Sequence, residues 1–272
     1  MTTATHEPSA LADALRHDTI LDIRAVTKAF GGNRAVDGCS FAVRRGTITG
    51  LIGPNGAGKS TLLNVIAGAL PATSGSILLD GQSIEGLRPH ELLARGLART
   101  FQVPRPIPTM TVLENLVLAG REQAGERIWN AWFRSGLVGR QENEIVDRAL
   151  EVLAYVNLIH LRDAYAANLS GGQKKLLEFA RTLMVQPRLV LLDEPAAGVN
   201  RTLMRQLAGY IEEQCHAHGV TFLIVEHDMD LVARLCDPVV VMAQGQRLFE
   251  GSFDEVRRNQ TVLDAYLGGQ VP

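Results

Sequence analysis

The sequence has few cysteines and no excess of charge of either sign. Of its 272 residues only three are cysteines, Cys39, Cys215 and Cys236. They are odd in number and far apart, so we expect no disulfide framework and predict that all three are buried and reduced. Lysine and arginine number 27 against 29 aspartate and glutamate residues, which gives a net charge of -2. This balance offers no basic surface, so nucleic acid is not an expected partner.

Long apolar runs are also absent. No stretch of about 18 apolar residues occurs, so we expect no segment to span a bilayer, and any membrane association would be peripheral. Residues 1–18 lack the basic region and apolar run of a secretory signal, and we interpret them as a flexible N-terminal segment. The length suits one large domain, or a core with a smaller subdomain.

Short apolar runs alternate with longer helical patterns along most of the chain. The run at 47–52 stops at Gly53, which is typical of a buried parallel strand. Strands that alternate with helices predict an α/β fold, in which helices cover both faces of a parallel sheet. The expected strands are 20–26, 47–52, 77–79, 189–192 and 221–225, the expected helices are 61–70, 111–120, 203–218 and 253–267, and 238–251 is an expected hairpin.

The middle of the chain has a different character. Residues 103–109 are rich in proline and exclude regular helix, whereas 122–161 are mostly helical in pattern. We therefore predict an inserted helical subdomain at about 103–168. Its two tryptophans, Trp129 and Trp132, fit either the core of that subdomain or an exposed patch that contacts a partner.

A glycine-rich motif follows the expected strand at 47–52. Residues 53–60 match G-x-x-x-x-G-K-[ST], whose glycines let successive N–H groups face phosphate oxygens at the start of a helix. Lys59 can reach the β- and γ-phosphates of a nucleotide, and Ser60 can bind Mg²⁺. A plain glycine-rich turn with a solvated lysine is the alternative, and the flanking strand and helix argue against it. The expected nucleotide-binding residues are Gly53, Pro54, Asn55, Gly56, Ala57, Gly58, Lys59, Ser60 and Thr61.

Two acidic residues end the apolar strand at 189–192. Ligands of open α/β sheets bind beyond the carboxyl ends of the strands, where Asp193 and Glu194 lie. Asp193 is expected to hold Mg²⁺, and Glu194 to polarise an attacking water. Solvated acids at a strand end are the alternative, which a neighbouring phosphate loop disfavours.

A third motif distinguishes between the many classes of protein that have a phosphate loop. Leu169-Ser170-Gly171-Gly172-Gln173 resembles the signature motif of ATP-binding cassette (ABC) ATPases. In the same family pattern, Gln102 resembles the Q-loop glutamine and His227 the switch histidine. Residues 197–200 resemble the D-loop, and Phe30 resembles the aromatic residue that stacks on adenine. The resemblance extends from about Ile20 to Gly268.

The resemblance implies a fold, a reaction and a set of site residues. The implied fold is a P-loop NTPase (RecA-like) parallel-sheet core with an N-terminal antiparallel β subdomain and the inserted helical subdomain, within an ABC ATPase domain at 19–272. The implied reaction is ATP hydrolysis with ATP and Mg²⁺ bound. Glu194, His227 and Gln102 would be catalytic, and Ser60, Gln102 and Asp193 would hold the metal.

The resemblance also implies a dimer, which is either a homodimer or a pair with a paralogue. Ser170, Gly171, Gly172 and Gln173 of one chain would cap the γ-phosphate held by the other chain. Taken alone, Ser170 also fits an ordinary helix N-cap. The D-loop departs from the family pattern, because Asn200 stands where Asp is common and Arg201 where Pro is frequent.

The C-terminal stretch 262–268 resembles ATPases of branched-chain amino acid uptake systems. This implies integral membrane permease subunits as partners, indirectly an extracytoplasmic solute-binding protein, and a peripheral place at the cytoplasmic face of the membrane. The same stretch resembles ATPases of lipid or lipopolysaccharide export, which stay an alternative. A non-transport ABC protein and a small-molecule kinase with a phosphate loop fit less well, the latter because of the signature and His227.

Overall fold

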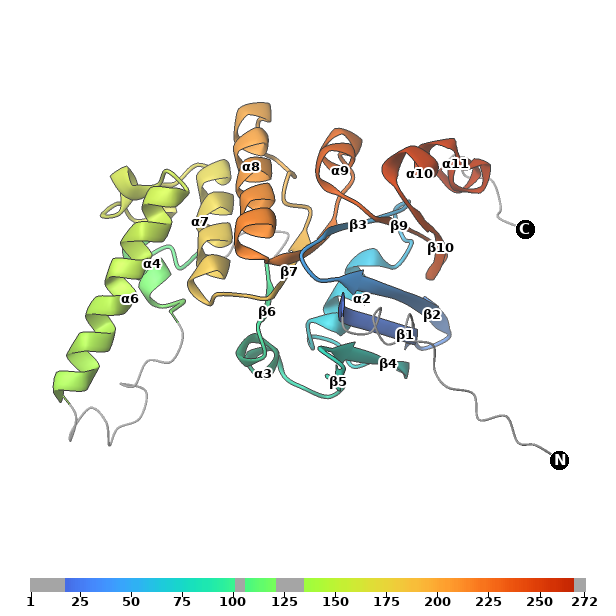
Figure 1. Ribbon diagram of the computed structural model, residues 1–272, viewed down its shortest axis with the longest axis horizontal. Helices are drawn as coiled ribbons and strands as arrows, with labels where there is room; N and C mark the ends of the chain where they lie inside the picture. The colour runs from blue at the N-terminus through green and yellow to red at the C-terminus, as the bar shows by residue number, and fades with distance from the viewer. Residues whose placement is uncertain (1–17, 101–105, 121–134, 267–272) are drawn as a thin grey trace.

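The computed structural model describes residues 18–100, 106–120 and 135–266, which fold around two β-sheets (Figure 1). The smaller sheet has four strands in the order β2-β1-β4-β5, and all of its pairs are antiparallel. The first strand extends past the predicted residue 26, because backbone pairing with its neighbour continues to the Phe30–Asn33 pair. The strands are β1 (Thr19–Phe30), β2 (Asn33–Arg44), β4 (Ser74–Leu79) and β5 (Gln82–Ser83).

The larger sheet has six strands in the order β10-β9-β3-β8-β7-β6. Its pairs are parallel except for β9 with β10, which form the predicted hairpin. Every residue of β3, β7, β8 and β9 is buried, which explains why these strands are continuous apolar runs in the sequence. The strands are β3 (Ile48–Ile52), β6 (Leu97–Arg99), β7 (Leu189–Asp193), β8 (Thr221–Val225), β9 (Val239–Ala243) and β10 (Gln246–Gly251).

Helices cover both faces of the larger sheet. Leu62 and Leu63 of α2 share one apolar cluster with Leu191, whereas Leu177 of α7 shares a second cluster with Leu192. Successive residues of a strand point to opposite faces, so α2 and α7 pack on opposite faces of β7. The helices are α2 (Lys59–Ile66), α3 (Pro89–Ala94), α4 (Val112–Val117), α6 (Ser135–Tyr155), α7 (Gly171–Met184), α8 (Arg201–His218), α9 (Met229–Leu235), α10 (Phe253–Arg258) and α11 (Gln260–Tyr266).

This architecture confirms the predicted fold class, a P-loop NTPase core with an N-terminal antiparallel sheet, and corrects several helix bounds. The helix predicted at 61–70 is α2, which follows Gly58 at φ 97° and ends before Gly68 at φ 68°. The helix predicted at 253–267 is two helices, because Asn259 is extended and accepts a hydrogen bond from the Val262 N–H. Of the long helical pattern at 122–161, α6 covers 135–155, and residues 121–134 with both tryptophans lie outside the described residues.

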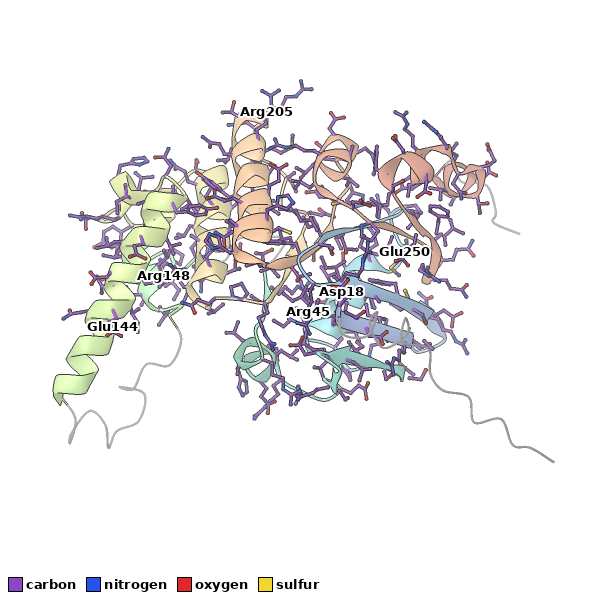
Figure 2. The ribbon with its side chains drawn as sticks, in the orientation of Figure 1. Asp18, Arg45, Glu144, Arg148, Arg205 and Glu250 are labelled. Atoms are coloured by element: carbon purple, nitrogen blue, oxygen red, sulfur yellow. The ribbon has the colours of Figure 1, made fainter. Side chains whose placement is uncertain are left out.

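The described residues place the cysteines in the core and many charged side chains at the surface. All three cysteines are free and buried, as predicted. Exposed charged side chains of α6 and α8 include Glu144, Arg148 and Arg205 (Figure 2). None of the described helices is both long and apolar enough to cross a bilayer.

Candidate nucleotide site

The phosphate loop connects the end of β3 to the start of α2 and has glycine where no other residue fits. Gly53, Gly56 and Gly58 have φ values of 149°, 81° and 97°. A Cβ atom on Gly53 would lie 2.0 Å from the carbonyl oxygen of Met242, and one on Gly58 would lie 2.2 Å from that of Ala35. The glycines therefore allow both the turn and its close packing against β9 and β2.

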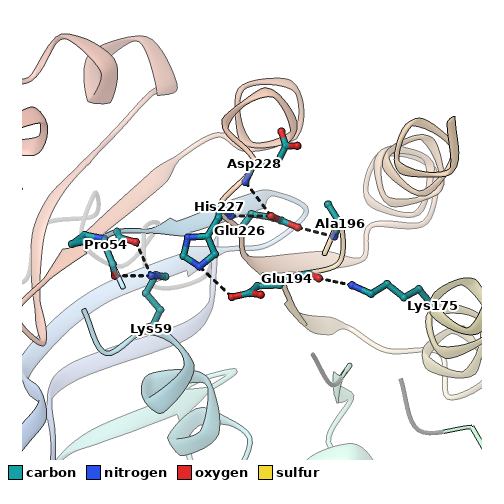
Figure 3. Close-up of polar contacts among 9 residues, drawn as sticks. Pro54, Lys59, Lys175, Glu194, Ala196, Glu226, His227 and Asp228 are labelled. Atoms are coloured by element: carbon teal, nitrogen blue, oxygen red, sulfur yellow. Dashed lines mark hydrogen bonds and ion pairs between the residues drawn. The ribbon is translucent and has the colours of Figure 1, made fainter. Parts of the chain in front are cut away.

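Lys59 is the first residue of α2 and directs its ammonium group back over the loop. Its Nζ donates hydrogen bonds to the carbonyl oxygens of Gly53 at 2.6 Å and Pro54 at 3.0 Å (Figure 3). Burial lowers the pKa of Lys59, and the carboxylates of Glu194 and Asp193 partly offset this shift. The cation thus lies in the electrostatic field of both acidic residues.

Asp193 is the last residue of β7 and is 4% exposed. Its Oδ2 accepts a hydrogen bond of 3.2 Å from Nη2 of Arg99, whose Nη1 donates to Oδ1 of Asn64 at 2.7 Å. Its Oδ1 is buried and has no hydrogen-bond partner among the described residues. A buried carboxylate oxygen without a donor fits a cation ligand, since buried polar atoms are rarely left unpaired. Sequence reasoning did not identify Arg99, which lies at the end of a three-residue strand.

Glu194 and His227 meet at the ends of adjacent strands. Glu194 adopts a left-handed backbone conformation with φ 49°, and its Oε1 lies 3.1 Å from Nε2 of His227. The sequence places these residues 33 positions apart, and the β7–β8 pairing, up to Asp193 with Val225, brings them together. The arrangement can hold a water beside a carboxylate and an imidazole, as a general base requires.

Glu226 joins the two loops that carry Glu194 and His227, and the sequence motifs assigned it no role. Its carboxylate is 3% exposed and accepts three backbone hydrogen bonds. Oε1 accepts from the N–H of Ala196 at 2.7 Å, and Oε2 accepts from those of His227 at 2.8 Å and Asp228 at 3.2 Å (Figure 3). The signal that could have identified it is an acid directly after the apolar run 222–225.

The signature motif begins α7 and forms a capping box. Ser170 Oγ accepts from the N–H of Gln173 at 3.3 Å, and the Gln173 side chain accepts from the Ser170 N–H at 2.9 Å. Ser170 and Gly171 are nevertheless exposed to solvent. Because α7 and α2 cover opposite faces of the sheet, the signature and the phosphate loop of one chain begin on opposite sides of it.

Of the remaining predicted positions, Phe30 and Asn200 are described by the structure. Phe30 ends β1 with 50% of its surface exposed, and Nζ of Lys28 is 5.1 Å from its ring centroid. Asn200 of the D-loop caps α8 through a 2.9 Å hydrogen bond from the Leu203 N–H. Gln102 lies outside the described residues.

The chain matches the ABC transporter family over residues 36–197. It belongs to the ABC transporter ATPases. Residues 246–272 of this ABC ATPase also match a second family, described as branched-chain amino acid ATP-binding cassette transporter.

Individual relatives are similar to this chain over nearly its whole length. A probable branched-chain amino acid transport ATP-binding protein LivG of Archaeoglobus fulgidus is 42% identical, over 92% of this chain and 96% of its own. The high-affinity branched-chain amino acid transport ATP-binding protein BraF of Pseudomonas aeruginosa is 39% identical, over 92% and 98%.

Solved structures of ABC cassettes are similar as well. MJ1267, an ATP-binding cassette of an ABC transporter in its ADP conformation, is 39% identical with a TM-score of 0.79, over 92% of this chain and 99% of its own. The ATP-binding cassette MJ0796, in a dimeric post-hydrolysis state bound to ADP and Pi, is 25% identical with a TM-score of 0.72, over 86% and 98%.

Proposed function

We propose that this ABC ATPase binds and hydrolyses ATP as a dimer and thereby powers the uptake of branched-chain amino acids. The observation that carries the proposal is the meeting of Lys59, Asp193, Glu194 and His227 beyond the carboxyl ends of β3, β7 and β8. These four side chains supply a cation for the phosphates, a metal ligand, a base and a polar partner for that base.

Each residue of this group has a distinct part in the proposed reaction. The loop N–H groups and Lys59 bind the β- and γ-phosphates, and Phe30 stacks on the adenine. Glu194 accepts hydrogen bonds from the attacking water and orients it, while His227 holds the Glu194 carboxylate in place. Ser60, Gln102 and Asp193 would hold Mg²⁺, which would neutralise charge on the phosphates. Oδ1 of Asp193, which has no hydrogen-bond partner among the described residues, suits this role.

A dimer follows from the position of the signature. One chain presents Ser170, Gly171 and Gly172 at the carboxyl edge of its sheet, on the face opposite to its own phosphate loop. A second chain, related by a two-fold axis, can place its signature against the γ-phosphate of the first. The dimeric MJ0796 structure supports this arrangement.

The cargo is suggested by the relatives and by the C-terminal match. LivG and BraF are named as branched-chain amino acid transport proteins, and the family matched at 246–272 has the same description. A subunit of this kind needs integral permease subunits, is expected at the cytoplasmic face of the membrane, and acts with a solute-binding protein on the other side. The names of these relatives favour amino acid transport over lipid export.

The test is to isolate the tagged chain with its membrane partners and to reconstitute the complex in vesicles with a branched-chain amino acid-binding protein. We expect permease subunits to co-purify and ATP to drive uptake of radiolabelled leucine, isoleucine or valine. The same complex with Glu194→Gln is the matched control and should not transport. ATP hydrolysis that is stimulated by a lipid and not by the amino acids would instead favour the export alternative.

A further inference from the structure

Lys175 extends from the first turns of α7 to the segment that follows β7. Its Nζ donates a hydrogen bond of 2.7 Å to the carbonyl oxygen of Glu194 (Figure 3). It donates a second one, of 3.2 Å, to the carbonyl oxygen of Pro195. The ammonium group is charged and its acceptors are backbone carbonyls, so these hydrogen bonds are stronger than neutral ones. They attach the signature helix directly to the backbone of the proposed base.

The backbone at Glu194 needs such support. A residue other than glycine is strained at a φ of 49°, and strained residues persist only where their surroundings hold them. Lys175 holds the carbonyls of residues 194 and 195, and Glu226 holds the next N–H group, that of Ala196, as described above. The direction of the Glu194 side chain toward His227 depends on this backbone geometry.

The start of α7 has a second contact with the same region. A Cβ atom on Gly172 would lie 2.1 Å from Cδ2 of Leu203, at the start of α8 just after the D-loop. The signature therefore packs closely against one end of the segment 194–203, while Lys175 is bonded to the other end. The first turns of α7 therefore contact both ends of this segment.

We propose that Lys175 is a positioning residue for ATP hydrolysis, whose ammonium group holds the Glu194 backbone and couples it to the signature helix. The proposal rests on the proposed function. There, the signature contacts the nucleotide bound by the partner subunit, and Glu194 acts on the nucleotide bound by its own chain. Lys175 then connects the two sites of the dimer through one chain. It acts through Glu194 and does not itself touch the nucleotide.

Purified full-length variants test this role by separating turnover from binding. Lys175→Met removes the ammonium group at similar length, and we expect kcat to fall about 10- to 100-fold while KM and the affinity for a fluorescent ATP analogue change less than about threefold. Lys175→Arg should restore most of kcat. Lys174→Met is the matched control, because Nζ of Lys174 donates its hydrogen bond to the carbonyl oxygen of Ala167, away from the backbone of Glu194. The Lys174→Met variant should hydrolyse ATP like the wild type.

A double-mutant cycle shows whether Lys175 acts through Glu194. We expect Lys175→Met to lower the single-turnover rate by less than about threefold in a Glu194→Gln background, because the base is already lost. An unchanged kcat in Lys175→Met overturns the inference, and so does an equal loss in both backgrounds. If Lys175→Met does not fold, Lys175→Gln replaces it, and loss of nucleotide binding in both variants counts against the inference. A wild-type chain that does not hydrolyse ATP contradicts the proposed function itself.

Discussion

Oε1 of Glu226 lies 2.7 Å from the backbone nitrogen of Ala196, two residues after Glu194, and Oε2 lies 2.8 Å from that of His227. One buried carboxylate thus connects the loop after β7 to the loop after β8. The side chains of Glu194 and His227 meet across the same gap, 3.1 Å apart. The distance between the proposed base and its imidazole partner therefore depends on a residue that binds the backbone of both loops.

We predict that Glu226→Ala loses both stability and activity. It leaves three backbone N–H groups without their acceptor, at a cost of about 1–3 kcal/mol for each group that water cannot reach. We expect the free energy of unfolding in urea to fall by about 3 kcal/mol, and kcat to fall more than the affinity for ATP. Glu226→Gln keeps one carbonyl oxygen and should lose less. A Glu226→Ala variant with wild-type kcat would show that the two loops hold their positions without this carboxylate.

Glu194→Gln should trap the ATP-bound dimer. The amide cannot accept a proton from water, whereas the phosphate loop and the signature are unchanged, so ATP stays bound between the two chains. We expect this variant to elute as a dimer from a sizing column with ATP and Mg²⁺, and as a monomer without nucleotide. Adding Lys59→Ala removes the cation at the β- and γ-phosphates and should abolish the dimer. Monomeric elution of Glu194→Gln with ATP would count against the shared site.

Substitutions of Phe30 test its proposed contact with adenine. Its ring is half exposed at the end of β1 and beside the cation of Lys28, a geometry open to stacking. Loss of a stacked base costs about 1–3 kcal/mol, so Phe30→Ala should weaken ATP binding roughly 5- to 150-fold. Phe30→Tyr keeps the ring face and should bind ATP like the wild type. Calorimetric titration with ATP measures both, and equal affinity in all three proteins would remove Phe30 from the site.

The sequence predicted those parts of the site that are encoded locally. The loop at 53–60 and the acids at 193 and 194 lie within short motifs next to apolar strands, so their place in the fold follows from neighbouring residues. Lys175 and Arg99 escaped prediction because their partners are 19 and 94 positions away. The break between α10 and α11 was missed because the helical pattern continues across Asn259, and only its capping side chain marks the boundary.

We predict that the buried thiols make the free energy of unfolding fall at high pH. Burial raises the pKa of Cys236 to about 12 and that of Cys39 to about 11, with desolvation as the main cause in both. The unfolded chain releases these protons near its ordinary thiol pKa of 9.0, whereas the folded chain keeps them. Because the folded pKa is the higher one, the stabilisation is complete below pH 9.0 and is lost as the pH rises toward the folded value.

Cys236→Ala measures this contribution. One retained proton corresponds to about 1.4 kcal/mol per pH unit, so the variant should become steadily less destabilised relative to the wild type between about pH 9.5 and 11. Urea unfolding at pH 7.5, 9.5 and 11 gives the difference at each pH. Cys39→Ala should show the same trend over a narrower range, since its folded pKa is lower. A constant difference between Cys236→Ala and the wild type at all three pH values would mean that the thiol ionises no later in the folded chain than in the unfolded one.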